Sequence, residues 1–425
     1  MNRLAPFLWV CCALAIPTMY AALTPGNVLV VYNDPGSLGT SDGFQIWDYY
    51  KTKRSGVLGL NLDDANLYDS AASFPSDLGS ISYQDFETKI RDKIWMHIED
   101  NNLESTVRVI VLTKGIPHQI QDYNDGPVRQ ASAVQALRDT DNATLASVDS
   151  ELTLIKFDLS DGETDGGMDS EADNFIVNPY YQSTTSIPYS SAPNINFSQI
   201  AFSSGGEVIF RYWEMLQGPF DASPGELYLT ARLDGSSVAE VKDLIDRGAD
   251  VRLDTKRFSV VLDETTVADD DHPFNFDGGD FTATNTLLSP TWANIVHDKT
   301  ASFLVGQTPV TPPPGTDLTT VLDPVVFLAS YGANHLLDNH TNWVFTYQGQ
   351  LPHGAIFNTY ESYNGMKFGG SIPTLVEHGQ VADWVAIGGT FGIGHVWEPF
   401  AFGVGQNEFL TDNFYNNGLT WVESA

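Results

Sequence analysis

Patterns typical of buried strands alternate with patterns typical of helices along much of this chain. Residues 27–32 form a β-branched run that ends at an Asn-Asp-Pro-Gly turn, and in residues 82–102 phenylalanine or isoleucine recurs every four positions. The first pattern indicates a strand, and the second indicates a helix with one apolar face. Because parallel strands need long crossover connections, this alternation predicts an α/β fold in which helices flank a largely parallel sheet.

Similar elements recur to the end of the chain, with a less regular region at residues 120–225. We expect further strands at residues 107–113, 226–232, 258–262, 325–329, 355–359 and 390–396, and further helices at residues 41–50, 237–248 and 375–386. We therefore predict two subdomains that pack as one body: residues 23–225, with an irregular acidic insertion, and residues 226–425. The final residues resemble the start of a helix without a stop signal, so we expect the second subdomain to be truncated at its end.

Residues 1–22 have the features of an export signal. A positive charge precedes an apolar run at residues 7–16, and residues 19–22 offer a cleavage site. The run is too short to span a bilayer, so we predict a signal peptide and a secreted or cell-envelope protein. Both cysteines, Cys11 and Cys12, lie inside this segment. The mature chain then has no thiol, which excludes disulfides, zinc–thiolate sites and cysteine nucleophiles.

The chain is strongly acidic, with a formal net charge of −33 at pH 7. Such a surface repels phosphate backbones, so we expect no nucleic-acid partner. No later apolar stretch reaches the roughly 20 residues that a membrane span needs, so we expect no span in the mature chain. The charge supplies many oxygen ligands for hard cations such as calcium, and adaptation to a salty habitat would explain it equally well.

Polar side chains stand at the ends of several predicted strands. They are Asn33, Lys114, Asn334, His335, Glu361, Ser362, His395 and Glu398. In open α/β sheets, ligands bind beyond the carboxyl ends of the strands, so we expect these side chains to share one rim. Asn33, Lys114 and Asn334 are our candidates for binding a substrate.

Ser362 is the candidate nucleophile of this rim. A serine hydroxyl reacts only when a base lies within hydrogen-bond reach and another group orients that base. His335 or His395 could be the base. Glu361 or Glu398 could orient it.

Two glycines could complete such a site. Gly365 and Gly394 could bring backbone N–H groups close to an oxyanion. A structural interpretation stays open, since Ser362 lacks the Gly-x-Ser-x-Gly elbow of α/β hydrolases and strand-end polar residues often bond only to turn backbone.

Acidic residues suggest two further binding sites. Asp149 and Glu151 are two positions apart, so on a strand they would share one face and could bind a cation or a substrate amine. Helix capping, or a pair with an arginine, is the alternative. A loop resembles a calcium site because its carboxylates alternate, at Asp161, Glu163, Asp165 and Asp169. Its twelfth position is Ala172 instead of glutamate, so either a calcium cofactor or a flexible surface loop fits.

Five sequence stretches resemble a known family. They are VRVIVLTKGIP, SVDSEL, NPYY, TARLDG and GGTFGIGHVWEP. Together they are similar to an uncharacterised family of secreted bacterial proteins from genomes that carry exosortase, a proposed protein-sorting transpeptidase. This resemblance implies export and a link to protein sorting at the cell envelope.

The order of elements also resembles the gingipain-type cysteine peptidases, which have a caspase-like fold. ARLDGSSVAEVKDLIDRG is similar to one strand and the following helix of that family. The family's Gly-His-Gly appears here as residues 332–334, with His335 one position later, and its cysteine position appears as Ser362. Two functions therefore stay open: a peptidase-like hydrolase or transpeptidase that acts on a protein or peptide substrate, and a non-catalytic binding or sorting accessory.

Overall fold

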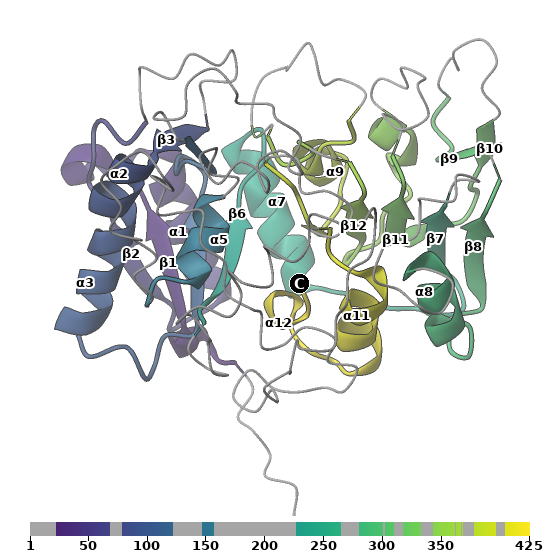
Figure 1. Cartoon of the computed structure of the whole chain (residues 1–425), viewed down its shortest axis with the longest axis horizontal. Helices are drawn as coiled ribbons and strands as arrows, with labels where there is room; N and C mark the ends of the chain where they lie inside the picture. The colour runs from purple at the N-terminus through teal and green to yellow at the C-terminus, as the bar shows by residue number, and fades with distance from the viewer. Residues whose placement is uncertain are drawn as a thin grey trace, which may run out of the picture.

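A computed structural model of the chain provides the three-dimensional structure. It describes residues 23–68, 79–121, 147–156, 227–264, 280–300, 302–309, 318–332, 343–361, 363–366, 368, 378–396 and 404–425. These residues form two larger parallel sheets that lie next to each other, with helices packed against their faces (Figure 1). The predicted α/β fold with parallel sheets and flanking helices is confirmed.

The first larger sheet has four strands in the order β2-β1-β4-β6, and all neighbours are parallel. The strands are β1 (Val28–Tyr32), β2 (Leu58–Asn61), β4 (Val109–Thr113) and β6 (Leu229–Leu233). One face packs against α1 (Asp42–Lys53), and α7 (Val238–Ala249) packs against α1. The other face packs against α2 (Tyr83–Phe86), a π-helical turn (Glu87–Arg91), α3 (Asp92–Asp100) and α5 (Val148–Thr153).

Local sequence signals account for these elements. Ser41 caps α1, because its hydroxyl accepts a hydrogen bond from the Phe44 N–H. The four-residue stripe predicted within residues 82–102 is fully buried against the sheet, at Phe86, Ile90, Ile94 and Ile98. That stripe prediction is therefore confirmed.

The second larger sheet has five parallel strands in the order β13-β12-β11-β7-β8. They are β7 (Ser259–Asp263), β8 (Asn294–Asp298), β11 (Val325–Ser330), β12 (Ile356–Thr359) and β13 (Phe391–Gly392). One face packs against a 3₁₀ helix (Trp343–Tyr347) and α9 (Val381–Ala386). The other packs against α8 (Asp280–Leu288), α11 (Asn407–Thr411), a π-helical turn (Asp412–Asn416) and α12 (Trp421–Ser424).

Two short parallel pairs complete the described part. They are β3 (Ser80–Ser82) with β5 (Gln119–Gln121), and β9 (Phe303–Val305) with β10 (Leu318–Thr320). Short 3₁₀ turns also lie at Pro25–Asn27 and Pro35–Ser37. Within the described residues, no helix combines the length and apolarity that a membrane crossing requires.

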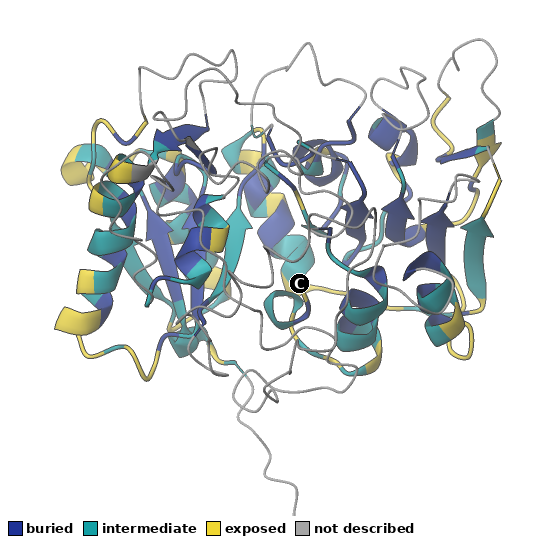
Figure 2. Cartoon of the chain, viewed as in Figure 1, coloured by how far each residue is buried: buried dark blue, intermediate teal, exposed yellow. Residues whose placement is uncertain are grey.

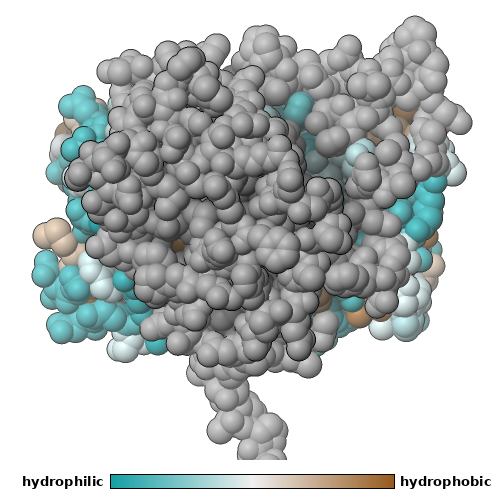
Figure 3. Space-filling view, in the orientation of Figure 1, coloured by the Kyte–Doolittle hydropathy of each residue, from teal (hydrophilic) through white to brown (hydrophobic). Residues whose placement is uncertain are grey.

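Burial follows position within each sheet. β4, β7 and β11 are buried along their whole length, whereas β8 is only partly buried (Figure 2). The described residues that are visible in the space-filling view are mostly hydrophilic (Figure 3). Several polar side chains at the ends of the strands are buried as well, among them Asp263, Ser330 and Thr359.

Two expected elements differ from the structure. Residues 378–380 are not helical, so α9 begins at Val381 rather than at 375, and the strand expected at 390–396 is only the two residues of β13. The division at residues 225/226 stays a prediction. β6 follows that point yet pairs with β4, so the chain leaves the first sheet only after β6.

Candidate functional site

Glu361 anchors the end of β12 in the second sheet. Its side chain is fully buried, and its Oε2 accepts hydrogen bonds from the Gly379 N–H (2.8 Å) and the Thr359 hydroxyl (3.3 Å). Gly332, which follows β11, lies directly against it: a Cβ at Gly332 would stand 2.1 Å from Glu361 Cγ, and its φ of +94° favours glycine. The carboxylate is therefore fixed by the backbone around it.

His395, which follows β13, lies beside the end of β12. Its Nδ1 is 3.2 Å from the Glu361 carbonyl oxygen. A carbonyl oxygen can only accept, so Nδ1 carries the proton of the neutral ring and Nε2 carries a lone pair. Nε2 is buried and has no hydrogen-bond partner among the described residues. Burial lowers the pKa of His395 to about 4, against a smaller rise from the Glu361 carbonyl, so the ring is neutral at pH 7.

Asn364 holds the backbone of His395 in place. The Asn364 Oδ1 accepts from the His395 N–H (2.6 Å), and the Asn364 Nδ2 donates to the Thr359 hydroxyl (2.8 Å). The Gly365 N–H donates to the His395 carbonyl (2.9 Å). This N–H is therefore not available to an oxyanion, which corrects the role suggested above for Gly365. Gly365 also touches Gly394, since a Cβ on Gly365 would lie 2.9 Å from the Gly394 carbonyl carbon.

Tyr363 has an uncommon backbone conformation. Its φ is +56°, a left-handed value that non-glycine residues seldom adopt. In folded proteins such residues concentrate at functional sites, where the surrounding structure holds the strain. The strain lies one position after Ser362 in the sequence.

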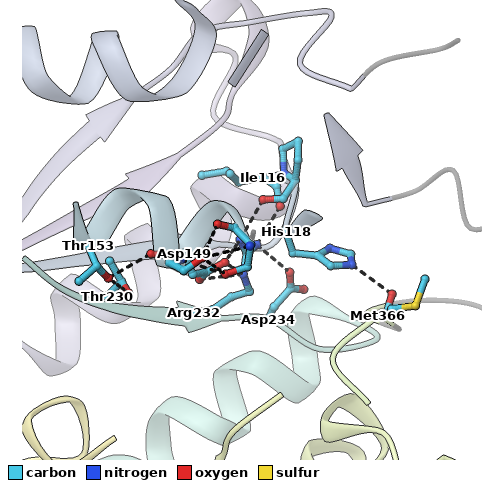
Figure 4. Close-up of polar contacts among 11 residues, drawn as sticks. Ile116, His118, Asp149, Thr153, Thr230, Arg232, Asp234 and Met366 are labelled. Atoms are coloured by element: carbon cyan, nitrogen blue, oxygen red, sulfur yellow. Dashed lines mark hydrogen bonds and ion pairs between the residues drawn. The ribbon is translucent and has the colours of Figure 1, made fainter. Parts of the chain in front are cut away.

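The end of the first sheet carries a buried cluster of charges (Figure 4). Arg232 on β6 pairs with Asp149 on α5 (Nη2 to Oδ2, 2.7 Å) and also donates to the Ile116 and Pro117 carbonyls (2.8 and 2.9 Å). Asp234 lies 3.6 Å from Arg232. Burial raises the pKa of Asp234 to about 6, although Arg232 and nearby Lys114 act in the opposite direction.

Asp149 and Glu151 do not share the face that a strand would have given them. These residues lie on α5, where positions two apart do not share a face. Ser147 caps this helix by accepting from the Ser150 N–H. Asp149 pairs with Arg232, which is the alternative stated above, while Glu151 is buried.

Lys114 and Asn33 also make structural contacts. The Lys114 ammonium donates to the carbonyls of Gly235 (2.7 Å) and Phe368 (2.9 Å), so it joins the ends of β4, β6 and the segment after β12. The Asn33 side chain exchanges two hydrogen bonds with the backbone of Asp64, which ties together the turns after β1 and β2. Their role in substrate binding stays a prediction.

The structure describes only some of the residues that we expected to share one rim. Lys114, Glu361 and His395 belong to connected segments, because Lys114 contacts Phe368 and Gly365 contacts His395. Asn33 makes its contacts at the β1 and β2 turns. The other predicted site residues lie outside the described residues: Asn334, His335, Ser362, Glu398, Asp161, Glu163, Asp165 and Asp169. In the part of the chain that is described, no three His, Cys, Asp or Glu side chains gather as a metal site would require.

Sequence reasoning missed two polar residues of this edge. Asn364 had only a turn signal, the Asn-Gly pair, and nothing local indicates that it bonds to His395. Asp263 ends β7 and is buried, so its pKa lies well above the ordinary value, and the Ser330 hydroxyl donates to it (3.0 Å). The sequence signal for Asp263 was an aspartate directly at the end of an apolar strand pattern.

Comparison of the chain with protein-family models, with curated proteins and with solved structures produced no match.

Proposed function

We propose that this chain is a secreted peptidase-like hydrolase in which Ser362 is the nucleophile and His395 is its general base. The observation that carries the proposal is the state of the His395 ring. Nδ1 is held by the Glu361 carbonyl, and Nε2 has no partner among the described residues. That carbonyl belongs to the peptide bond between Glu361 and Ser362, so the ring is tied to the backbone next to the serine.

The proposed reaction is acyl transfer to serine and then to water. The Ser362 hydroxyl gives its proton to His395 Nε2 as its oxygen attacks the substrate carbonyl. The imidazolium returns this proton to the leaving amine, and an acyl-serine ester remains. Water then attacks the ester with the same base, which releases the acid and restores the serine.

Two properties of the site agree with these roles. His395 is neutral at pH 7, which is the form that accepts a proton, although its lowered pKa makes it a weaker base than an ordinary histidine. The strained Tyr363 follows Ser362, as strained turns present nucleophiles in other hydrolases. We propose that this reaction takes place at the cell envelope, on a protein or peptide substrate.

A non-catalytic binding or sorting accessory is the second candidate. Several polar groups proposed for the site make structural contacts instead, which favours this second function. Lys114, Asn33 and Asp149 all bond to neighbouring backbone or side chains. In this case the edge would keep its architecture without reacting.

A fluorophosphonate probe separates the two candidates. We expect the wild-type protein to be labelled, Ser362→Ala to lose the label, and His395→Gln to react about 10²- to 10⁴-fold more slowly, because a positioned base contributes that much. Ser289→Ala, at an exposed serine after α8, is the control and should label like wild type. Labelling that is absent, or unchanged in Ser362→Ala, removes the catalytic role and leaves the accessory function.

A further inference from the structure

Gln119 connects the first half of the chain to the residue that follows His395. It is the first residue of β5 and is only 2% exposed. Its Oε1 accepts from the Ser80 hydroxyl (2.8 Å), and its Nε2 donates to the Val396 carbonyl (3.0 Å). A carbonyl oxygen only accepts, so the contact with Val396 identifies that end of the amide as the NH₂ group and leaves Oε1 to accept from the Ser80 hydroxyl.

Two neighbours of Gln119 make similar contacts with the second half. The His118 Nε2 donates to the Met366 carbonyl (3.1 Å), and the Lys114 ammonium donates to the Phe368 carbonyl (2.9 Å). The His118 ring fits only because residue 79 is glycine, where a Cβ would lie 1.9 Å from its Cε1. Residues 114–119 thus bond to two segments of the second half: residues 366–368, which follow Ser362 in the sequence, and Val396, which follows His395.

We propose that Gln119 is a positioning residue for His395, so that the site is completed across the junction between the two larger sheets. This inference rests on the proposed function. His395 is held by Asn364 at its N–H and by Gly365 at its carbonyl, and Gln119 holds the next carbonyl, that of Val396. With Gln119 in place, the backbone on both sides of the ring is fixed.

The expected effect follows from the loss of one donor. In Gln119→Glu, a carboxylate oxygen faces the Val396 carbonyl, so the two acceptors repel each other and the His395 segment shifts. A misplacement of about 1 Å can cost about 10²-fold in rate. We therefore expect probe labelling to fall by about 10- to 100-fold, and the His395 ring to leave its buried contact with the Glu361 carbonyl.

The test combines labelling with an NMR titration of the histidine rings. The His395 signal is assigned by its absence in His395→Gln. In wild type it should titrate near pH 4, and in Gln119→Glu it should titrate closer to the ordinary value of 6.5. Gln119→Met, which removes the donor without adding charge, is a second variant in case the first does not fold.

Gln350→Glu is the matched control. Gln350 is also buried and donates to the Val321 and Asp323 carbonyls (3.0 and 3.2 Å). Its own backbone carbonyl accepts from the Val325 N–H at the amino end of β11. It should lower the melting temperature without moving the His395 titration. An unmoved His395 titration in both Gln119 variants overturns the positioning role. If wild type does not label, the hydrolase proposal fails, whereas the titration still decides whether Gln119 positions the ring.

Discussion

Replacing Arg232 by glutamine is expected to lower the free energy of unfolding by about 3–5 kcal/mol, the usual cost of removing one partner from a buried ion pair. The Arg232 side chain is only 10% exposed and bonds to Asp149 and to the carbonyls of Ile116 and Pro117. Glutamine would leave two carbonyls without their donors and would leave Asp149 and Asp234 without a balancing guanidinium. Urea unfolding at pH 7 measures the change.

Arg252→Gln is the matched control for this substitution. Arg252 also pairs with an aspartate, Asp250, but its side chain is 68% exposed. Exposed pairs contribute about 0–1 kcal/mol, so little change is expected. A cost below about 1 kcal/mol for Arg232→Gln would show that the buried cluster does not stabilise the first sheet.

Acidification from pH 7.5 to pH 5 is expected to cost about 2 kcal/mol of stability through His118 alone. Burial, with a smaller effect of Arg232, lowers the pKa of His118 to about 3, whereas the unfolded chain titrates near 6.5. Between these values the unfolded state binds a proton that the folded state excludes, so stability falls as pH falls. A decrease from pH 6.5 to 5 at about 1.4 kcal/mol per pKa unit gives the stated loss.

Other titratable groups change the pH dependence of stability in both directions. The contribution of His118 is therefore measured as the difference between wild type and a His118 variant. His395 has the same sign as His118, because its pKa is also lowered. Asp234 has the opposite sign: its pKa is raised to about 6, so the folded state binds the extra proton and gains stability as pH falls from 6 towards 3.8.

His118→Gln keeps a donor for the Met366 carbonyl and removes the titration. Urea unfolding at both pH values should show that wild type loses about 2 kcal/mol more than this variant. Equal losses would mean that His118 is not the group excluded from protonation.

The candidate site was only partly predictable from the sequence. Glu361, His395 and Lys114 were predicted as site residues because they follow strand patterns in the sequence. The carboxyl ends of parallel strands meet at one edge of a sheet, where ligands bind. The partners of these residues were not predictable. The Gly379 N–H bonds to Glu361, and the Val381 N–H bonds to the Asn364 carbonyl, so tertiary contacts decide that α9 starts at Val381.

Local errors have similar causes. The shared face suggested for Asp149 and Glu151 held only if they lay on a strand, whereas Ser147 caps a helix there and the pair with Arg232 stabilises α5 on β6. A period of two over so few residues is a weak signal.

The sequence by itself determined the α/β architecture, because the alternating strand runs and four-residue helical stripes can bury their apolar side chains only in helix-covered parallel sheets. It also placed His395 at the end of a strand. Only the tertiary structure decided that this histidine stands against the Glu361 carbonyl and that Gln119 bonds to its neighbour. The physical reason is that these hydrogen bonds join segments 34 and 277 residues apart, whose meeting depends on the packing of the whole chain.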